Sequence, residues 1–497
     1  MQNSRASRFF PPSPRPEPQV RIGRMWSKQM MEPGGQQDSA HVSGDFPPAR
    51  FTTPLQQLAY EEVARSFAKR PVELQKLPER QADAVVSLLP LDLPLDIAAR
   101  YVASESYWCS RCFAQCEGSM SGSISGSSSS WKQLFFERAL SHALSSQPLS
   151  LTQSSQDLRF PSAHLNEGVS TAQRSARPSN EVLNHLTECA RFVHALSMRV
   201  NPGETGATVS KLHALDGHVS KLALSCAASD VGMEYDRRLF GMTEQDCSSF
   251  CSFIVNSVSL TRLDLSNNRL DDQLISQLAH ALSDNFTVGC VSFAHNRVGD
   301  HGAEKLAGML CERPDVWKLD LSDNNIADDG AQSLATTLQS KSSVSFLNLK
   351  LNRISDRGAS AIIASLEHST CSVASLVLAA NDDCVGDATT AALTSSIPRS
   401  ESLTDLDISG NDIANSNGRK LMEALEGSTM LQHVEVERCN LSDDVSRGIV
   451  NITQRNRSRC GGIDSSFGEI PESSLLMQMK AQLEQQAQQR SQRVPAG

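Results

Sequence analysis

Aromatic residues are scarce in this 497-residue chain, where Phe, Trp and Tyr together make up 5% and apolar residues of all kinds 39%. A chain of this length would ordinarily hold two to four domains. So few large side chains argue against a large conventional core outside any repeated structure.

Long apolar runs are also missing, because no stretch of 18 apolar residues occurs. The first residues are rich in Pro and Arg and contain no apolar segment. We therefore expect neither a membrane span nor a signal peptide. The formal net charge is −10, and this acidic balance argues against nucleic acid as a general partner.

Catalytic motifs are absent as well. The sequence contains no P-loop, no G-x-G-x-x-G and no H-E-x-x-H, and its Ser/Gly-rich stretch never forms G-x-S-x-G. His295 and His301 lie in expected turns, where a surface or capping role is the simpler interpretation. We expect a protein that is not an enzyme and that needs no cofactor or metal.

The thirteen cysteines are scattered, and several occupy expected core positions, such as Cys290 and Cys439. This usage is typical of reduced, buried thiols and favours a cytoplasmic compartment.

Cys109, Cys112 and Cys116 form C-x-x-C-x-x-x-C, which could begin a zinc site. A fourth ligand is lacking, since the nearest histidine, His142, lies beyond the Ser/Gly stretch. Cysteines on one helix face without metal are the preferred interpretation.

The chain does contain a pattern that returns every 28 to 30 residues. Leu260, Leu263, Leu265, Asn268 and Leu270 fit L-x-x-L-x-L-x-x-N-x-L. Six further copies begin at Val288, Val316, Val344, Val373, Leu403 and Leu431. This period is the leucine-rich repeat signature. It predicts an α/β solenoid with a parallel concave sheet and outer helices.

The ninth position of each repeat predicts a structural column, formed by Asn268, Asn296, Asn324, Asn352, Asn381, Asn411 and Cys439. An amide there can satisfy backbone groups in the turn that leaves the strand. Asp300, Asp328 or Asp329, and Asp356 stand where helices should begin and are interpreted as N-caps.

The third, fifth and seventh positions of each strand should face the concave side, because side chains alternate along a strand. The candidate partner-binding residues on this face are Arg262, Lys318, Phe346, Lys350, Asp405, Asp407, His433, Glu435 and Glu437. Four of them, Asp405, Asp407, Glu435 and Glu437, should crowd into an acidic patch at the C-terminal end. Asp264 and Asp320 belong to the common L-D-L-S pattern and are interpreted as consensus residues.

Composition divides the rest of the chain. We expect a disordered tail at 1–53, a small all-α domain at 54–145 with a Ser/Gly loop at 118–130, a linker at 146–215 with a helix at 181–198, repeats at 216–460 comprising an irregular first repeat and seven regular ones, and a tail at 461–497. A helical stripe at 474–492 predicts either a partner-binding helix or a frayed one.

The repeats resemble the ribonuclease-inhibitor class of leucine-rich repeats, which names no function by itself. The more specific blocks lie outside the seven regular repeats, around Trp108, at 130–138 and, within the irregular first repeat, at 230–247. These blocks and the repeats after them resemble the dynein regulatory complex subunit 5 family, also called T-complex-associated testis-expressed protein 1. The resemblance covers roughly residues 55–145 and 215–460.

This resemblance implies a non-catalytic scaffold subunit of the nexin–dynein regulatory complex, which links doublet microtubules and regulates dynein-driven sliding in cilia and flagella. The implied location is the axonemal cytoskeleton. The implied partners are other subunits of the complex, with doublet microtubules or dynein as further candidates, and neither nucleic acid nor membrane. Trp108, Trp131, Phe135 and Phe136 match the family's motif and should fill a small core, with Arg138 exposed.

The alternative is a leucine-rich repeat regulator of an enzyme, of the GTPase activator or nuclease inhibitor type. Arg297 and Arg353 lie in expected turns and could serve a GTPase activator, although Asn-Arg is also ordinary turn composition.

Overall fold

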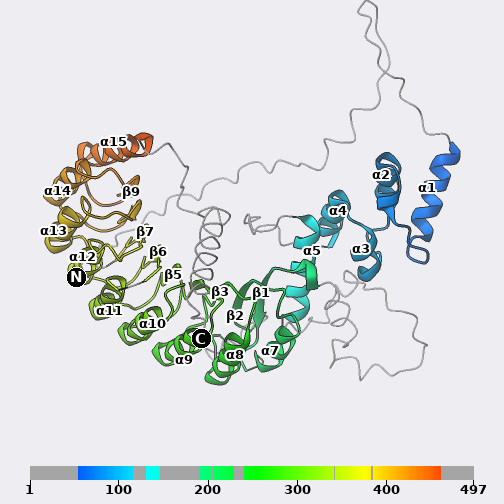
Figure 1. Ribbon diagram of the computed structural model, residues 1–497, viewed down its shortest axis with the longest axis horizontal. Helices are drawn as coiled ribbons and strands as arrows, with labels where there is room; N and C mark the ends of the chain where they lie inside the picture. Colours follow the sequence, from blue (N-terminus) through cyan, green and yellow to red (C-terminus); the bar gives the residue numbers. More distant parts are fainter. Residues whose placement is uncertain are drawn as a thin grey trace, which may run out of the picture. The chain divides into compact units, whose positions relative to one another are not determined.

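A computed structural model describes residues 54–115, 130–145, 190–203, 205–228, 240–340, 342–381 and 384–459 (Figure 1). The predicted tails at 1–53 and 461–497, the helix at 474–492 and the Ser/Gly loop up to Ser130 lie outside these residues. Among the described residues, no helix is both long and apolar enough to cross a membrane.

Short helices make up the part before the repeats. They are α1 (Pro54–Ser66), the 3-10 helix η2 (Leu74–Lys76), α2 (Glu79–Leu88), α3 (Leu95–Tyr101), α4 (Glu105–Gln115) and α5 (Trp131–Leu144). Pro78 and Pro94 stand at the N-caps of α2 and α3, where a missing N–H costs no helical hydrogen bond. A short non-helical segment separates α3 from α4. The Trp108 indole Nε1 in α4 donates to the carbonyl of Val102 in this segment at 2.9 Å.

The aromatic side chains form the core of this helical part, as the sequence indicated. Trp108 and Phe136 are fully buried and Phe135 nearly so. The Trp108 ring centroid lies 5.3 Å from that of Phe135 and 5.2 Å from that of Phe136. Arg138 was expected to be exposed but is half-buried. Its guanidinium lies 4.0 Å from the Cys112 Sγ.

In the part of the chain that the structure describes, nine parallel strands follow in sequence order and form one sheet. They are β1 (Ala195–Val200), β2 (Lys221–Cys226), β3 (Arg262–Asp264), β4 (Cys290–Ser292), β5 (Lys318–Asp320), β6 (Phe346–Asn348), β7 (Ser375–Val377), β8 (Asp405–Asp407) and β9 (His433–Glu435). The predicted leucine-rich repeat solenoid is therefore confirmed.

A helix follows each strand, and these helices line the outer side of the curved sheet (Figure 1). They are α7 (Thr205–His213), α8 (Glu244–Asn256), α9 (Asp272–Asp284), α10 (Asp300–Glu312), α11 (Asp328–Leu338), α12 (Asp356–Ser365), α13 (Asp387–Ser396), α14 (Asn415–Glu426) and α15 (Asp443–Arg459). Strand positions four and six, such as Leu263 and Leu265, are fully buried against helix residues such as Leu278. Each repeat thus buries its apolar face only by stacking on its neighbours.

The sheet begins earlier than the sequence predicts. A helix was expected at 181–198 and the first repeat at 216, but residues 190–192 form a 3-10 helix, η4 (Ala190–Phe192), and β1 follows. The helix prediction is therefore wrong for residues 190–198, the part of it that the structure describes. Leu196, Met198 and Val200 are buried and alternate with exposed Ser197 and Arg199, which is the period of a half-buried strand. Residues 181–189 lie outside the described part.

Helix α5 covers the otherwise unpaired edge of β1. The Glu137 carboxylate accepts hydrogen bonds from the backbone N–H groups of His194 (3.1 Å) and Ala195 (2.9 Å). The Ser141 hydroxyl accepts from the Ser197 N–H, and the Ser145 hydroxyl from the Arg199 N–H, both at 3.2 Å.

The rise of the helix and the rise of the strand explain why α5 can satisfy the N–H groups along the edge of β1. Four helical residues rise about 6.0 Å and two strand residues about 6.6 Å, so side chains at every fourth helix position meet alternate N–H groups of the strand. Helix α5 therefore acts as the N-terminal cap of the solenoid and hides a sheet edge that could pair with another chain.

Candidate partner-binding surface

The predicted concave residues at the third position of each strand form one continuous row across the sheet. Strand pairing sets Lys221 beside Arg262, Cys290 beside Lys318, Phe346 beside Ser375, and Asp405 beside His433. This row carries cationic side chains toward its N-terminal end and a carboxylate toward its C-terminal end.

The candidate residues differ in accessibility. Lys350 and Glu437 are exposed, while Arg262, Lys318, Phe346, His433 and Glu435 are half-buried. Asp405 and Asp407 are only 9% and 6% exposed. The accessible acidic side chains at the C-terminal end are therefore Glu435 and Glu437.

Lys318 and Phe346 form a pair on neighbouring strands β5 and β6. The Lys318 ammonium lies 4.4 Å from the centroid of the Phe346 ring. Such a cation–π contact holds the ammonium over the aromatic face and presents both chemistries at one place on the sheet.

The buried carboxylates of β8 are engaged locally. Asp405 accepts a hydrogen bond from the Thr404 hydroxyl at 2.6 Å, and Asp407 accepts from the Ser409 N–H and hydroxyl. Asp264 and Asp320 likewise accept from serines two residues later, Ser266 and Ser322, as expected of consensus residues.

Burial and like charge act together at this end of the sheet. Burial raises the pKa of Glu435, the negative charges of Asp407 and Glu437 raise it further, and His433 and Lys350 oppose the shift. Burial also raises the pKa of Asp405, against the Thr404 hydrogen bond. A cationic group from a partner would relieve this repulsion.

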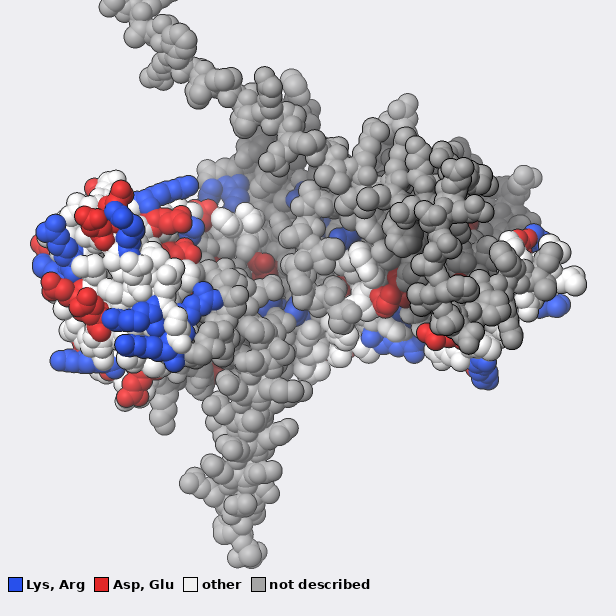
Figure 2. All heavy atoms as spheres, turned by 90° about the horizontal axis from the view of Figure 1, so that it is seen from above, with Lys and Arg blue, Asp and Glu red and all other residues white. Residues whose placement is uncertain are grey.

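Outside the concave row both signs of charge are interspersed. Figure 2 shows Lys and Arg beside Asp and Glu over the C-terminal repeats. A mixed surface of this kind favours specific contacts over attraction by net charge.

The asparagine column lies inside the solenoid and links consecutive repeats. In Asn324, Nδ2 donates to the carbonyls of Phe293 (2.9 Å) and Leu321 (3.0 Å), while Oδ1 accepts from the Val298 N–H at 3.0 Å. Asn268, Asn296, Asn352, Asn381 and Asn411 make equivalent bonds, and the Cys439 thiol donates to the Ile408 carbonyl at 3.3 Å. These contacts give the column a structural role.

The aspartates at the helix starts cap the next helix, not their own. Asp300 begins α10, and its Oδ1 accepts from the N–H groups of Ala327 (2.8 Å) and Gly330 (2.9 Å) at the start of α11. Asp328 makes the same two bonds to the start of α12. An added Cβ at Gly330 would lie 2.7 Å from the Asp300 Oδ1, so the position requires glycine. The interpretation of these residues as N-caps is therefore corrected to capping across repeats.

Replacement of Asp356 by Asn should make stability less dependent on pH. Burial opposes ionisation of Asp356, but the N–H groups of Thr389, Ala388 and Gly386 donate to it and hold its pKa below the ordinary value. A lowered folded-state pKa contributes stability above the unfolded pKa of about 3.9, and this contribution is lost as pH falls through the folded value.

We expect D356N to lower the free energy of unfolding at pH 7 by about 1 kcal/mol, the usual cost of a lost cap. The deficit should shrink in urea denaturation below about pH 4, where the wild-type carboxylate becomes protonated. Asp387 begins the next helix and is exposed, so D387N is the matched control. A deficit that stays constant with pH would contradict the ionic cap.

Arg313 is a buried cation that sequence reasoning missed. Its side chain is 1% exposed, and its guanidinium donates to the carbonyls of Leu282 (2.7 Å) and Val288 (3.2 Å) and pairs with Asp315. In the preceding repeat Asn285 donates to the carbonyls of Ile254 and Ser257 in the same way. The sequence does contain a signal for this role. Asn285 and Arg313 are 28 residues apart, and each lies three residues before the first position of a repeat.

The described cysteines of the C-x-x-C-x-x-x-C motif do not form a metal site with other described side chains. Cys112 is buried, Cys109 is half-buried, and Cys116 lies outside the described residues. Within the described part of the chain, no three His, Cys, Asp or Glu side chains gather as a metal site would require.

Two family models of the leucine-rich repeat match this chain, one over residues 318–335, 340–362 and 399–422 and the other over 259–281. The chain is 32% identical over 223 residues to dynein regulatory complex subunit 5 of Chlamydomonas reinhardtii, covering 45% of this chain and 50% of that protein. It is 26% identical over 241 residues to the Homo sapiens protein of the same name, covering 46% of each. These similarities confirm the resemblance, and the chain spans about half the length of these relatives.

Among solved structures, the actin-binding site 2 of leiomodin-1 matches 48% of this chain and 98% of its own, at 14% identity and a TM-score of 0.23.

Proposed function

We propose that this chain, similar to dynein regulatory complex subunit 5, is a non-catalytic scaffold subunit of the nexin–dynein regulatory complex in motile cilia and flagella. There it helps link doublet microtubules and regulate dynein-driven sliding. The observation that carries this proposal is the 32% identity to the Chlamydomonas protein of that name. The site of action is then the axonemal cytoskeleton.

The geometry supports a binding role. A nine-stranded parallel sheet offers a long concave face, and many carboxylates near its strands and turns accept hydrogen bonds from neighbouring serines or helix starts. Carboxylates held this way stabilise the solenoid and have no arrangement suited to acid–base catalysis.

The partner surface in this proposal is the concave face, and the partners are other subunits of the complex. Glu435 and Glu437 would meet a basic side chain, and the Lys318–Phe346 pair would meet a carboxylate or an apolar group about 14–19 Å away, three to four strand spacings along the sheet. Charge at such a face guides approach and register more than it supplies affinity.

The test uses axonemes of a mutant that lacks this protein. Cryo-electron tomography should show missing density in the link between doublets, and the full wild-type chain should restore it. An intact link in the null mutant would refute the scaffold role.

The partner surface has its own test in the same cells. Restoration with E435K/E437K should leave most links unfilled, because two carboxylates become cations on the concave face. The control E423K/E426K makes the same charge change at exposed positions of α14 and should restore the link. Equal restoration by both variants would leave the scaffold role standing and exclude this end of the concave face.

A further inference from the structure

Helix α8 carries two cysteines one turn apart, Cys247 and Cys251, whose Sγ atoms lie 4.0 Å from each other. We propose that this pair is a modification site for hydroperoxides, at which Cys251 is oxidised and Cys247 then closes a disulfide. This inference is independent of the proposed scaffold role.

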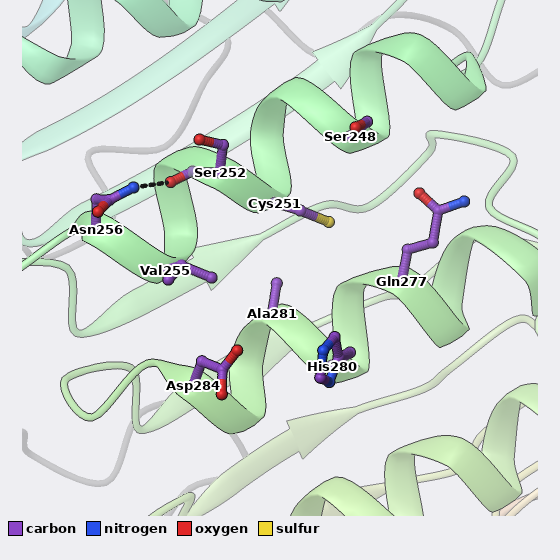
Figure 3. A pocket seen from close by; sticks show the side chains of 9 residues that line it. All are labelled: Ser248, Cys251, Ser252, Val255, Asn256, Gln277, His280, Ala281 and Asp284. Atoms are coloured by element: carbon purple, nitrogen blue, oxygen red, sulfur yellow. Dashed lines mark hydrogen bonds between the residues drawn. The ribbon is translucent and has the colours of Figure 1, made fainter.

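The two thiols differ in access. Cys247 is fully buried and its thiol lies 3.7 Å from the Leu274 carbonyl, whereas Cys251 is half-buried. Figure 3 shows the Cys251 sulfur pointing into the space between α8 and α9. A small oxidant can thus reach Cys251 but not Cys247.

The space beside Cys251 is a shallow groove of about 340 Å³. Its walls carry polar groups from both helices, including Ser248, Gln277 and His280 (Figure 3). A hydroperoxide is a small polar molecule that fits such a groove and can accept hydrogen bonds from its walls.

The contact between the sulfurs also favours reaction at Cys251. The hydrogen bond with Cys247 lowers the pKa of the Cys251 thiol, although burial opposes this shift. The same contact and burial raise the pKa of Cys247. Since the thiolate is the nucleophile, Cys251 is the residue that attacks.

The chemistry balances in two steps. The Cys251 thiolate attacks one peroxide oxygen, the O–O bond breaks, and the product is a sulfenic acid with release of water or an alcohol. The Cys247 sulfur then attacks the Cys251 sulfur, the S–O bond breaks, and the Cys247 proton leaves with the hydroxyl as water. The two thiols lose two electrons, and the peroxide gains them.

The bridge requires local distortion of α8. Residues four apart in a helix have Cα atoms about 6 Å apart, inside the range seen for disulfides, but their Cβ atoms lie about 5–6 Å apart, beyond the usual range of about 3.5–4.5 Å. The sulfurs must still approach by about 2 Å to reach bonding distance. A strained bridge is easily reduced, so the modification should be reversible by a dithiol reductant.

The experiment treats the reduced full-length protein with hydrogen peroxide, blocks remaining thiols with N-ethylmaleimide and analyses tryptic peptides by mass spectrometry. Peptide 239–262 contains Cys247 and Cys251 and no other cysteine. We expect it to lose two hydrogen atoms and to carry no label, and dithiothreitol should restore both labels.

Two variants and one internal control make the result decisive. In C247S, Cys251 should accumulate as a sulfenic acid that dimedone traps, while in C251S, Cys247 should remain reduced. Cys311, the exposed cysteine of α10, reports whether the peroxide dose was sufficient. The proposal is overturned if both thiols of 239–262 stay labelled when Cys311 is oxidised. It is equally overturned if Cys251 proceeds to sulfinic acid while Cys247 remains a thiol.

Discussion

Replacement of Arg313 by alanine should lower the free energy of unfolding by about 2–4 kcal/mol, because a buried acceptor that loses its donor costs about 1–3 kcal/mol and the buried packing of the side chain is lost as well. The guanidinium satisfies the carbonyls of Leu282 and Val288 and packs 5.3 Å from the exposed Phe286 ring. Without it, the buried Val288 carbonyl loses this donor, and the Leu282 carbonyl keeps only the Asn285 N–H.

The damage from R313A should be local at first, because each repeat of a solenoid contacts mainly its neighbours. Hydrogen exchange measured by mass spectrometry should therefore accelerate in α9 and α10 before it does in α13 and α14. R353A removes an exposed arginine from a turn and is the control. Unchanged exchange around residues 282–288 in R313A would show that the buried guanidinium is dispensable.

Loss of the edge cover should have the second large effect. E137A removes the acceptor of two backbone N–H groups at the start of β1, and a buried donor left unsatisfied costs about 1–3 kcal/mol. The double variant E137A/S141A also removes the acceptor of the Ser197 N–H and opens the strand edge.

We expect two measurable results from E137A/S141A. Hydrogen exchange in β1 should rise by a factor of about 30 for each 2 kcal/mol lost. Sedimentation should also reveal concentration-dependent self-association, because an open edge strand is a template for pairing. E137Q keeps an acceptor oxygen at the same position and should stay close to wild type. A monomeric double variant with protected β1 amides would contradict the capping role of α5.

The solenoid was predictable because its signals are local and repeated. Positions such as Leu263, Leu265 and Asn268 recur at one spacing, and each copy supports the others in one register. The strand β1, which precedes the expected first repeat at 216, was not predicted. Leu196, Met198 and Val200 make a short alternating run, and an apolar helical stripe over 182–196 suggested a different period.

The accessibility of the acidic patch was less predictable. Alternation along a strand predicts Asp405 and Asp407 on the concave side of β8, but it cannot tell that both are almost fully buried. Burial depends on everything that surrounds a side chain, whereas alternation reports only which way the side chain points. Only the structure therefore shows that Glu435 and Glu437 are the accessible carboxylates of the predicted acidic patch.

By itself, the sequence determined that the chain forms a leucine-rich repeat solenoid, because each repeat carries its own apolar spacing and its own asparagine. Only the tertiary structure decided how that solenoid is closed and tied together. Glu137 meets the Ala195 N–H across 58 residues, and Asp300 caps a helix that begins in the next repeat. Such contacts join groups that no shared period connects, so they emerge only when packing brings a buried donor and its acceptor to the same place.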